Sequence, residues 1–459
     1  MQTLERGTLA ATLQQRRDRL ASLVDFPVLL WSGRSSRRNF PANTFPFRAS
    51  SHFLYFAGIP LENAVIRLEA GQLTLFWDEP SPASALWHGA SPSRAAIAEH
   101  IGATAAYPLS ELASKGLDCA TIAALDAATL AHQHSSLQRA IIPAPGATDR
   151  DRALALAIAT LRLCHDAAAI AELRTAAHIS IQAHQAGMQA TAIATTEAEI
   201  RAAMEAVILA HNATTAYTSI VTVHGEVLHN NHYHHTVQPT DLLLADVGAE
   251  TPTGWAADIT RTWPISGRFS PTQRAIYAVV LAAHDACIAA MQPGAEYRDI
   301  HLLAAHTIAT GLVDLGILRG DPADLAAMDA HALFFPHGVG HLLGLDVHDM
   351  EDLGDWAGYA PGRTRSDRFG LGYLRLDRPL QPGMLVTIEP GFYQVPAILN
   401  DPQRRDRYAS VVNWERLAEF QDVRGIRIED DVLITATGTD VLTAALPTAI
   451  ADIETWVRS

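Results

Sequence analysis

The chain has 459 residues, a formal net charge of −15, 48% hydrophobic residues and 18% charged residues. This length predicts two or three domains, and the composition is that of an ordinary soluble globular protein. No basic cluster offsets the acidic balance, which argues against nucleic-acid binding.

The cysteines and the apolar segments indicate the compartment. Cys119, Cys164 and Cys287 are far apart and lack metal-ligand spacing, so this odd, sparse set indicates a reducing environment. No apolar segment follows the N-terminal Met, and no window approaches the roughly 18 apolar residues of a membrane helix. We therefore expect neither a signal peptide nor a membrane span, and we interpret the protein as cytoplasmic.

Helical and strand-like segments alternate over the first third of the chain. The predicted elements are a helix over 1–22, a buried strand over 27–31, a helix or strand over 50–58, a hairpin over 64–77, helices over 93–103 and 109–131, and strands at 105–107 and 141–142. The Pro-Ala-Pro-Gly segment at 143–146 is a candidate boundary. We therefore predict an α/β domain over residues 1–150.

Residues 151–459 are predicted to form one larger α+β domain of helices and antiparallel strands. Its predicted helices cover 151–162, 166–190, 197–211, 271–291 and 298–315, and its predicted strands cover 216–223, 241–245 and 258–262. Ser270 and Pro271 are a favourable cap and first position for the fourth of these helices.

A predicted hairpin over 241–262 carries two aspartates. Asp246 and Asp258 each lie among apolar residues, and the segment 251–254 supplies turn residues between the strands. A buried carboxylate is costly, and two carboxylates on one hairpin repel each other unless a cation neutralises them. The pair is therefore either part of a metal site or two aspartates that cap turns.

More residues of metal-ligand type follow. His337, His341 and His348 lie within twelve positions among glycine and apolar residues, although a lone histidine is more often a satisfied core residue. Glu389 ends one predicted strand, and Glu429 lies within another. The candidate ligands are Asp246, Asp258, His341, Glu389 and Glu429. Four carboxylates and one imidazole suit Mn²⁺ better than structural Zn²⁺, and their charge neutralises two divalent ions.

Five ordered motifs resemble the pita-bread metallopeptidases of the creatinase and methionine-aminopeptidase fold, above all the proline-specific branch of prolidase and aminopeptidase P. The motifs are Asp-Ile-Thr-Arg-Thr, His-Gly-Val-Gly-His, Leu-Asp-Val-His-Asp, Ile-Glu-Pro-Gly and Arg-Ile-Glu-Asp-Asp, within residues 165–450. Residues 43–55 resemble the N-terminal domain of that branch. The resemblance implies an α+β protein, with a C-terminal pita-bread domain and an N-terminal α/β creatinase-like domain that serves substrate access or oligomerisation.

The resemblance also implies how the candidate ligands are used. Asp246 would hold the first of two ions. Asp258 and Glu429 would bridge the two ions. His341 and Glu389 would complete the second. Mn²⁺ is the expected metal, with Zn, Co or Fe as alternatives. Arg427 and Thr260 would orient the carboxylates from behind.

Catalysis and substrate contacts are implied in the same way. The two ions would lower the pKa of a shared water, which attacks the carbonyl before proline. Glu389 would take the proton of that water and pass it to the leaving nitrogen, and a metal and His348 would stabilise the oxyanion. His337 and His229 would contact the substrate. Small peptides with proline at the second position are the expected substrates, and the assembly of relatives implies a homodimer or homotetramer.

The choice between a dipeptide and a longer peptide as the predicted substrate depends on the role of Arg375, which lies near the end of an insert over 351–379. We favour an Xaa-Pro dipeptidase, because an arginine at this place can bind the C-terminal carboxylate of a dipeptide. The alternative is an Xaa-Pro aminopeptidase acting on longer peptides, for which Arg375 pairs with a nearby aspartate on a surface loop. A remote alternative is a non-catalytic peptide-binding module, whose known examples have lost ligands that are present here.

Overall fold

The computed structural model describes residues 6–458, so the first five residues of the helix predicted over 1–22 lie outside the described residues. The chain forms two compact units. The first comprises Met1–Leu163, Pro252–Gly254 and Met350–Ala357, and the second comprises Cys164–Thr251, Trp255–Asp349 and Gly358–Ser459. The first unit continues beyond the candidate boundary at 143–146, because α7 (Asp149–Arg162) packs against α1 (Arg6–Ala21).

The first unit contains a five-stranded mixed sheet in the order β6-β5-β4-β1-β7. Its central pairs are antiparallel and its two outer pairs are parallel. Besides α1 and α7, its elements are β1 (Val28–Trp31), β2 (Arg37–Phe40), β3 (Asn43–Thr44), α2 (Ser51–Ala57), β4 (Val65–Glu69), β5 (Gln72–Phe76), α3 (Ala85–His88), α4 (Arg94–Ile101), β6 (Ala105–Tyr107), α5 (Leu112–Lys115), β7 (Ala120–Thr121) and α6 (Ala127–Leu137).

Most elements predicted for this unit are confirmed, and two are wrong. The segment predicted as helix or strand over 50–58 is the helix α2, which ends at Gly58 with φ 68°. The helix predicted over 109–131 is interrupted, because residues 120–121 pair with β1 as β7. Pairing with the sheet therefore overrides the helical composition. No strand forms at 141–142.

The second unit is an α+β domain. Its elements are α8 (Ala167–Ala190), α9 (Glu197–Ala210), β8 (Thr214–Thr215), β9 (Ile220–Thr222), β10 (Leu242–Asp246), β11 (Ala249–Glu250), β12 (Thr260–Pro264), α10 (Pro271–Ala290), α11 (Tyr297–Asp314), α12 (Pro322–Ala327), α13 (Asp355–Gly358, which begins in the first unit), β13 (Leu385–Ile388), β14 (Gly391–Tyr393), α14 (Pro396–Leu399), α15 (Pro402–Arg407), α16 (Trp414–Ala418), β15 (Gly425–Arg427), β16 (Asp430–Ile434), β17 (Thr439–Val441) and α17 (Ile450–Arg458).

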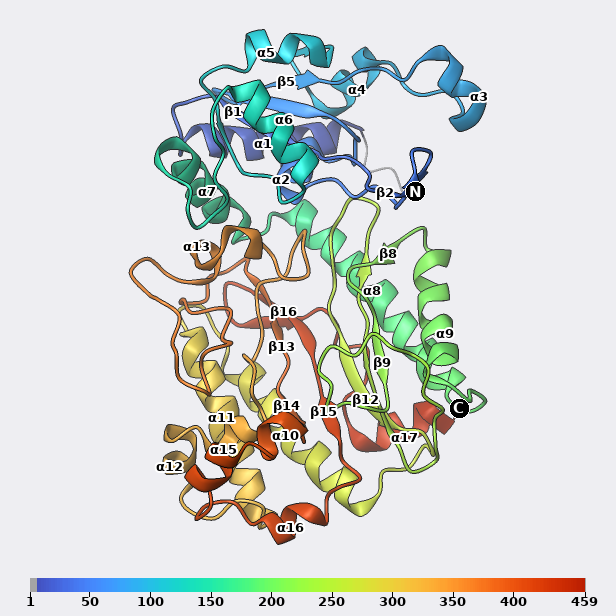
Figure 1. The fold of residues 1–459 in the computed structure, drawn as a ribbon, viewed down its shortest axis with the longest axis vertical. Coiled ribbons are helices and arrows are strands. Elements are labelled where there is room, and N and C mark those ends of the chain that lie inside the picture. The colour runs from blue at the N-terminus through green and yellow to red at the C-terminus, as the bar shows by residue number, and fades with distance from the viewer. Residues whose placement is uncertain (1–5, 459) are drawn as a thin grey trace. The chain divides into compact units, whose positions relative to one another are not determined.

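Short antiparallel sheets form the centre of the second unit. Their strand orders are β12-β10-β9, β13-β16-β17, β14-β15 and β11-β8, and an isolated bridge between Thr260 and Glu429 joins the first two. Figure 1 shows these strands between the α8–α9 pair and the α10–α11 pair. Ser270 caps α10 through a capping box, as its sequence predicts.

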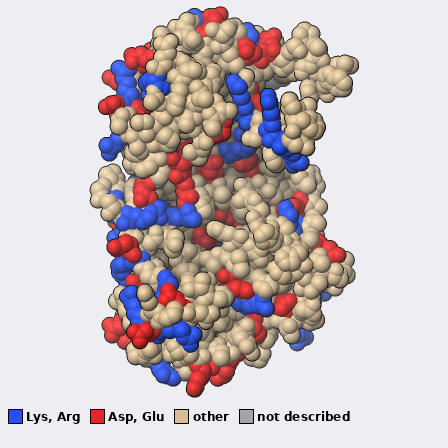
Figure 2. All heavy atoms as spheres, in the orientation of Figure 1, with Lys and Arg blue, Asp and Glu red and all other residues tan. Residues whose placement is uncertain are grey.

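The predicted hairpin is confirmed, with Asp246 opposite Thr260 in the β10–β12 pair. The strand predicted around Glu429 is split, since β15 ends at Arg427 and β16 begins at Asp430. On the face drawn in Figure 2, basic and acidic side chains are interspersed. No single described helix is long and apolar enough to cross a membrane. The consecutive helices α7 and α8 reach that length and apolarity only as a pair with a break between them.

Candidate metal centre

The two aspartates of the hairpin face each other in the second unit. Asp246 ends β10, Asp258 lies two residues before β12, and both are buried. The Tyr217 hydroxyl lies 2.5 Å from Asp246 Oδ1 and 2.6 Å from Asp258 Oδ1. One hydroxyl proton fully satisfies only one of the two oxygens, so the two facing carboxylates are short of donors. A metal ion bound between them would neutralise both.

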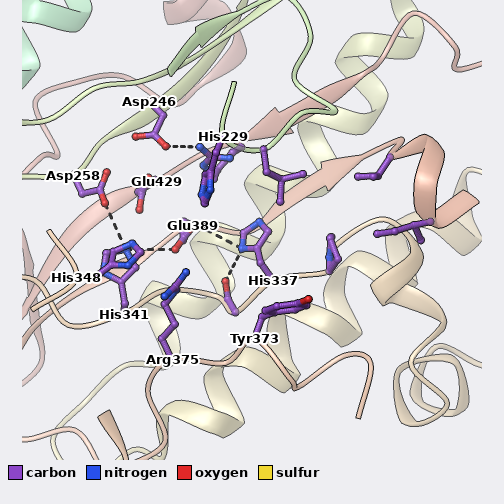
Figure 3. A pocket seen from close by; sticks show the side chains of 16 residues that line it. His229, Asp246, Asp258, His337, His341, His348, Tyr373, Arg375, Glu389 and Glu429 are labelled. Atoms are coloured by element: carbon purple, nitrogen blue, oxygen red, sulfur yellow. Dashed lines mark hydrogen bonds and ion pairs between the residues drawn. The ribbon is translucent and has the colours of Figure 1, made fainter. Parts of the chain in front are cut away.

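His341 and Glu389 approach the pair from two other segments. His341 Nε2 lies 3.5 Å from Asp258 Oδ2 and 3.6 Å from Glu389 Oε1. The other ring nitrogen of His341, Nδ1, lies 3.0 Å from the Leu342 carbonyl oxygen and donates to it. Nε2 faces the carboxylates, so Nε2 is the nitrogen that would bind a metal ion while Nδ1–H holds the ring in place. Figure 3 shows these side chains converging.

Glu429 completes the carboxylate cluster. Among the residues that the structure describes, Asp258, His341 and Glu429 offer ligand atoms that all lie within 4.8 Å of one another. Thr260 Oγ1 donates to Glu429 Oε2 at 2.7 Å. This side of the cluster is therefore fixed by a hydrogen bond between the two joined sheets.

Arg427 is the buried cation beside these carboxylates. Its guanidinium donates to Asp246 Oδ2 at 2.5 Å, to Thr260 Oγ1 at 2.9 Å and to the Tyr393 hydroxyl at 3.0 Å. The residue is 4% exposed. Arg427 and Thr260 therefore lie where the sequence predicted, in positions that orient Asp246 and Glu429.

Burial and mutual repulsion dominate the electrostatics of the cluster. Burial and the Asp246 charge raise the pKa of Asp258, and burial and the Glu429 charge raise the pKa of Glu389. Burial and the Asp258 charge raise the pKa of Glu429. Such a group of carboxylates is stable when ionised only if cations join it, because one guanidinium does not balance four acidic groups. The residues present therefore fit two divalent ions.

Three further histidines surround the cluster in one pocket of about 400 Å³. His348 lies beside His341, with 4.1 Å between ring centroids and 49° between the ring planes. His337 Nδ1 lies 3.6 Å from Glu389 Oε2, and His337 Nε2 lies 2.9 Å from the Tyr393 hydroxyl. Burial and the Arg427 charge lower the pKa of His337 to about 3, so this ring is neutral at neutral pH. His229 also lines the pocket.

The pocket is closed by residues of the insert and by an apolar wall. Arg375 and Tyr373 come from the insert, and Figure 3 shows the Arg375 side chain pointing toward Glu389. Apolar side chains that also line the pocket include Leu228, Val395 and Ile398. The structure thus brings together every residue proposed from the sequence for metal binding, catalysis and substrate contact.

Sequence reasoning missed three residues of the site. Tyr217 lies in a segment predicted only as a strand, and Tyr393 lies two residues beyond the Ile-Glu-Pro-Gly motif, where no role was assigned. Asp431, at the end of the Arg-Ile-Glu-Asp-Asp motif, accepts the backbone N–H of Asp258 at 3.3 Å. A phenol that bridges two ligands has no sequence signature of its own, whereas the position of Asp431 in a motif could have identified it.

Comparisons with known proteins agree with this geometry. Residues 171–436 match metallopeptidase family M24, and residues 13–121 match the aminopeptidase P N-terminal domain. A probable Xaa-Pro aminopeptidase pepP of Penicillium rubens is 32% identical over 89% of this chain and 88% of that protein. An Xaa-Pro dipeptidase of Homo sapiens is 39% identical, but over 48% of this chain and 43% of that protein.

Solved structures give the same fold over the whole chain. Aminopeptidase PepP of Pseudomonas aeruginosa has a TM-score of 0.81 and 27% identity, and covers 100% of this chain and 99% of its own. A zinc-substituted aminopeptidase P of Escherichia coli in complex with product has a TM-score of 0.80 and 28% identity over 98% of both chains. The predicted fold, a C-terminal pita-bread domain preceded by an N-terminal α/β domain, is confirmed.

Proposed function

Because the chain belongs to metallopeptidase family M24, we propose that it hydrolyses the Xaa-Pro bond at the free N-terminus of peptides longer than two residues. The observation that supports this function is the pocket, in which three buried carboxylates, the partly buried Glu389 and His341 lie beside three further histidines. The relatives that cover most of the chain support the preference for longer peptides, since they are named Xaa-Pro aminopeptidases. This preference replaces our sequence-based choice of a dipeptidase.

Two divalent ions, for which we propose Mn²⁺, would be held by Asp246, Asp258, His341, Glu389 and Glu429, and would supply a nucleophilic water near neutral pH. Glu389 is placed to accept a proton, because burial and the Glu429 charge raise its pKa. His348 lies beside His341, where it would donate to the substrate carbonyl. His337 gives its N–H to the Gly338 carbonyl, so it would contact the substrate with its ring rather than donate to it.

The proline requirement follows from its tertiary amide. A bond before proline has no N–H, so a site that cleaves it cannot depend on accepting that hydrogen bond. The apolar wall of Leu228, Val395 and Ile398 offers contact area for a ring, and the carboxylates of the cluster suit the free α-amine of the first residue.

A dipeptidase is the second candidate, and Arg375 is the observation that favours it. Arg427 donates to Asp246, Thr260 and Tyr393, whereas Arg375 approaches the pocket from the insert. A guanidinium there suits the C-terminal carboxylate of an Xaa-Pro dipeptide. If dipeptides are preferred, neutralising Arg375 should impair Ala-Pro far more than Ala-Pro-Ala.

The test compares Ala-Pro-Ala, Ala-Pro and Ala-Ala-Ala after chelation and Mn²⁺ re-addition. The proposal predicts fast release of Ala from Ala-Pro-Ala and little turnover of Ala-Ala-Ala. Faster turnover of Ala-Pro, lost in Arg375→Gln, would establish the dipeptidase instead. Metal-loaded protein that cleaves none of the three would refute both candidates. We also propose a homodimer or homotetramer, which light scattering after size-exclusion chromatography would measure.

A further inference from the structure

The insert supplies the pocket with Arg375, and its backbone is tightly enclosed there. A Cβ at Gly358 would lie 2.2 Å from the Arg375 carbonyl oxygen, and a Cβ at Gly338 would lie 2.9 Å from the Tyr373 carbonyl oxygen. The Leu374 carbonyl between them accepts from the Tyr359 hydroxyl at 2.7 Å. These contacts leave the backbone around Arg375 little room to shift.

Asp377 lies two residues beyond Arg375 and is fully buried. A buried carboxylate needs a cationic partner, and Asp377 has two. Arg363 Nη1 donates to Asp377 Oδ1 at 2.9 Å, and Arg298 forms an ion pair with Asp377 Oδ2. The Asp377 backbone is also held, since its N–H donates to the Gly358 carbonyl at 2.9 Å.

The two arginines connect the insert to the start of α11. Arg298 is the second residue of that helix, and Glu296 directly precedes it. Arg363 donates to both oxygens of Glu296, at 2.6 and 3.0 Å, while it donates to Asp377. Glu296 therefore fixes the direction of the Arg363 guanidinium, because a bidentate pair constrains its plane.

We propose that Arg363 and Arg298 are positioning residues for substrate recognition. Their ion pairs with Asp377 fix the backbone segment that carries Arg375 and thereby hold the Arg375 side chain in the pocket. This inference rests on the proposed Xaa-Pro peptidase function, and it concerns the binding of dipeptides, because the Arg375 guanidinium suits their C-terminal carboxylate. The ion pairs of the two arginines are with Asp377 and Glu296, which are not among the candidate metal ligands. Their effect on substrate therefore passes through Arg375, whose side chain leaves the same short segment two residues before Asp377.

A purely structural role for these ion pairs makes a different prediction. Arg363 is about one-third exposed, so its loss need not unfold the domain. If the pairs only stabilise the fold, their loss would lower the amount of folded protein and leave KM unchanged. If they position Arg375, their loss would raise KM, and it would have no further effect once Arg375 is absent.

The experiment is a double-mutant cycle of Arg363→Gln and Arg375→Gln in the Mn²⁺-loaded protein, with Ala-Pro as the substrate. We expect Arg363→Gln to raise KM roughly tenfold with kcat nearly unchanged. The double variant should be no worse than Arg375→Gln alone, and Arg363→Lys should recover part of the loss. Arg416→Gln is the matched control, since Arg416 forms an exposed ion pair with Glu419 elsewhere in the domain.

Effects that multiply in the double variant would overturn the inference, as would an Arg363→Gln variant with the KM of the Arg416→Gln control. A lower kcat with lower metal content would do the same, because it would indicate a disturbed metal centre. The same cycle is read from the Kd of Ala-Pro by calorimetry. Wild-type protein that binds Ala-Pro but cleaves no Xaa-Pro peptide would refute the proposed function, and the cycle of Kd values would still decide the inference.

Discussion

Arg427→Met tests the electrostatic account of the metal centre. The guanidinium is 4% exposed and donates to Asp246, Thr260 and Tyr393. Removing one member of such a buried ionic group costs about 3–5 kcal/mol when the partner charge stays buried. In the metal-free protein Asp258, Glu389 and Glu429 can offset that cost by binding protons, because burial and mutual repulsion already raise their pKa values.

The consequence is weaker and more pH-dependent metal binding. Each ion must displace more protons from the Arg427→Met protein, so we expect Mn²⁺ affinity to fall by about 10–100-fold near neutral pH. The deficit should shrink as pH rises, because the carboxylates then ionise without help from the guanidinium. Arg427→Lys should lie between the two, since it keeps the charge but not the fork of donors.

Isothermal titration calorimetry in buffers of different ionisation enthalpy measures both quantities, the Kd for Mn²⁺ and the protons released per ion. The prediction is a larger proton release for Arg427→Met than for wild type. An unchanged Kd, or a deficit that is the same at every pH, would show that Arg427 does not control the ionisation of the cluster.

Three further predictions concern single residues. Tyr217→Phe should cost the metal-free protein about 1–3 kcal/mol and the metal-loaded protein less, because ions then neutralise the two aspartates; equal losses by urea unfolding would contradict this. In the first unit, burial raises the pKa of Asp352, but His52 and Arg162 outweigh it and hold that pKa at about 2. This stability is complete above the unfolded pKa of 3.8 and is lost as pH falls through about 2, so Asp352→Asn should cost about 2 kcal/mol near neutral pH and progressively less in acid; a pH-independent loss on urea unfolding would be the wrong outcome. Gly340 has φ +156°, and a Cβ there would lie 2.1 Å from the Thr387 carbonyl oxygen, so Gly340→Ala should lower the thermal midpoint strongly while Gly438→Ala, with open space around it, should not.

The convergence of the five candidate ligands could be predicted because each of these residues has a local signature. Asp246 and Asp258 are acidic residues within apolar, strand-like sequence. His341 lies near glycines that allow close approach of the backbone. Glu389 and Glu429 belong to ordered motifs. The pairing of β10 with β12 and the Thr260–Glu429 bridge join the segments of Asp246, Asp258 and Glu429. The β13–β16 pair and the bridge between Leu342 and Val386 add the segments of Glu389 and His341.

The features that could not be predicted from the sequence depend on contacts between distant segments. Residues 120–121 have helical neighbours and become a strand only because β1 offers them an open edge. The first unit continues to Leu163 because α7 packs against α1, far away in sequence. Tyr217 contacts the aspartates because its loop packs against the hairpin, whereas the sequence of that loop shows only strand propensity. Hydrophobic periodicity and composition indicate the local preference for helix or strand, and they carry little information about pairings between distant segments.

The central claim is that this pocket is a metal-dependent Xaa-Pro peptidase centre, and a metal titration of activity tests it most directly. Chelated wild-type protein should be inactive on Ala-Pro-Ala and should regain activity as Mn²⁺ fills two sites. The Asp258→Asn protein should bind fewer ions and stay inactive, while Ala-Ala-Ala should remain uncleaved throughout. Full activity in chelator, or an Asp258→Asn protein as active as wild type, would contradict the account.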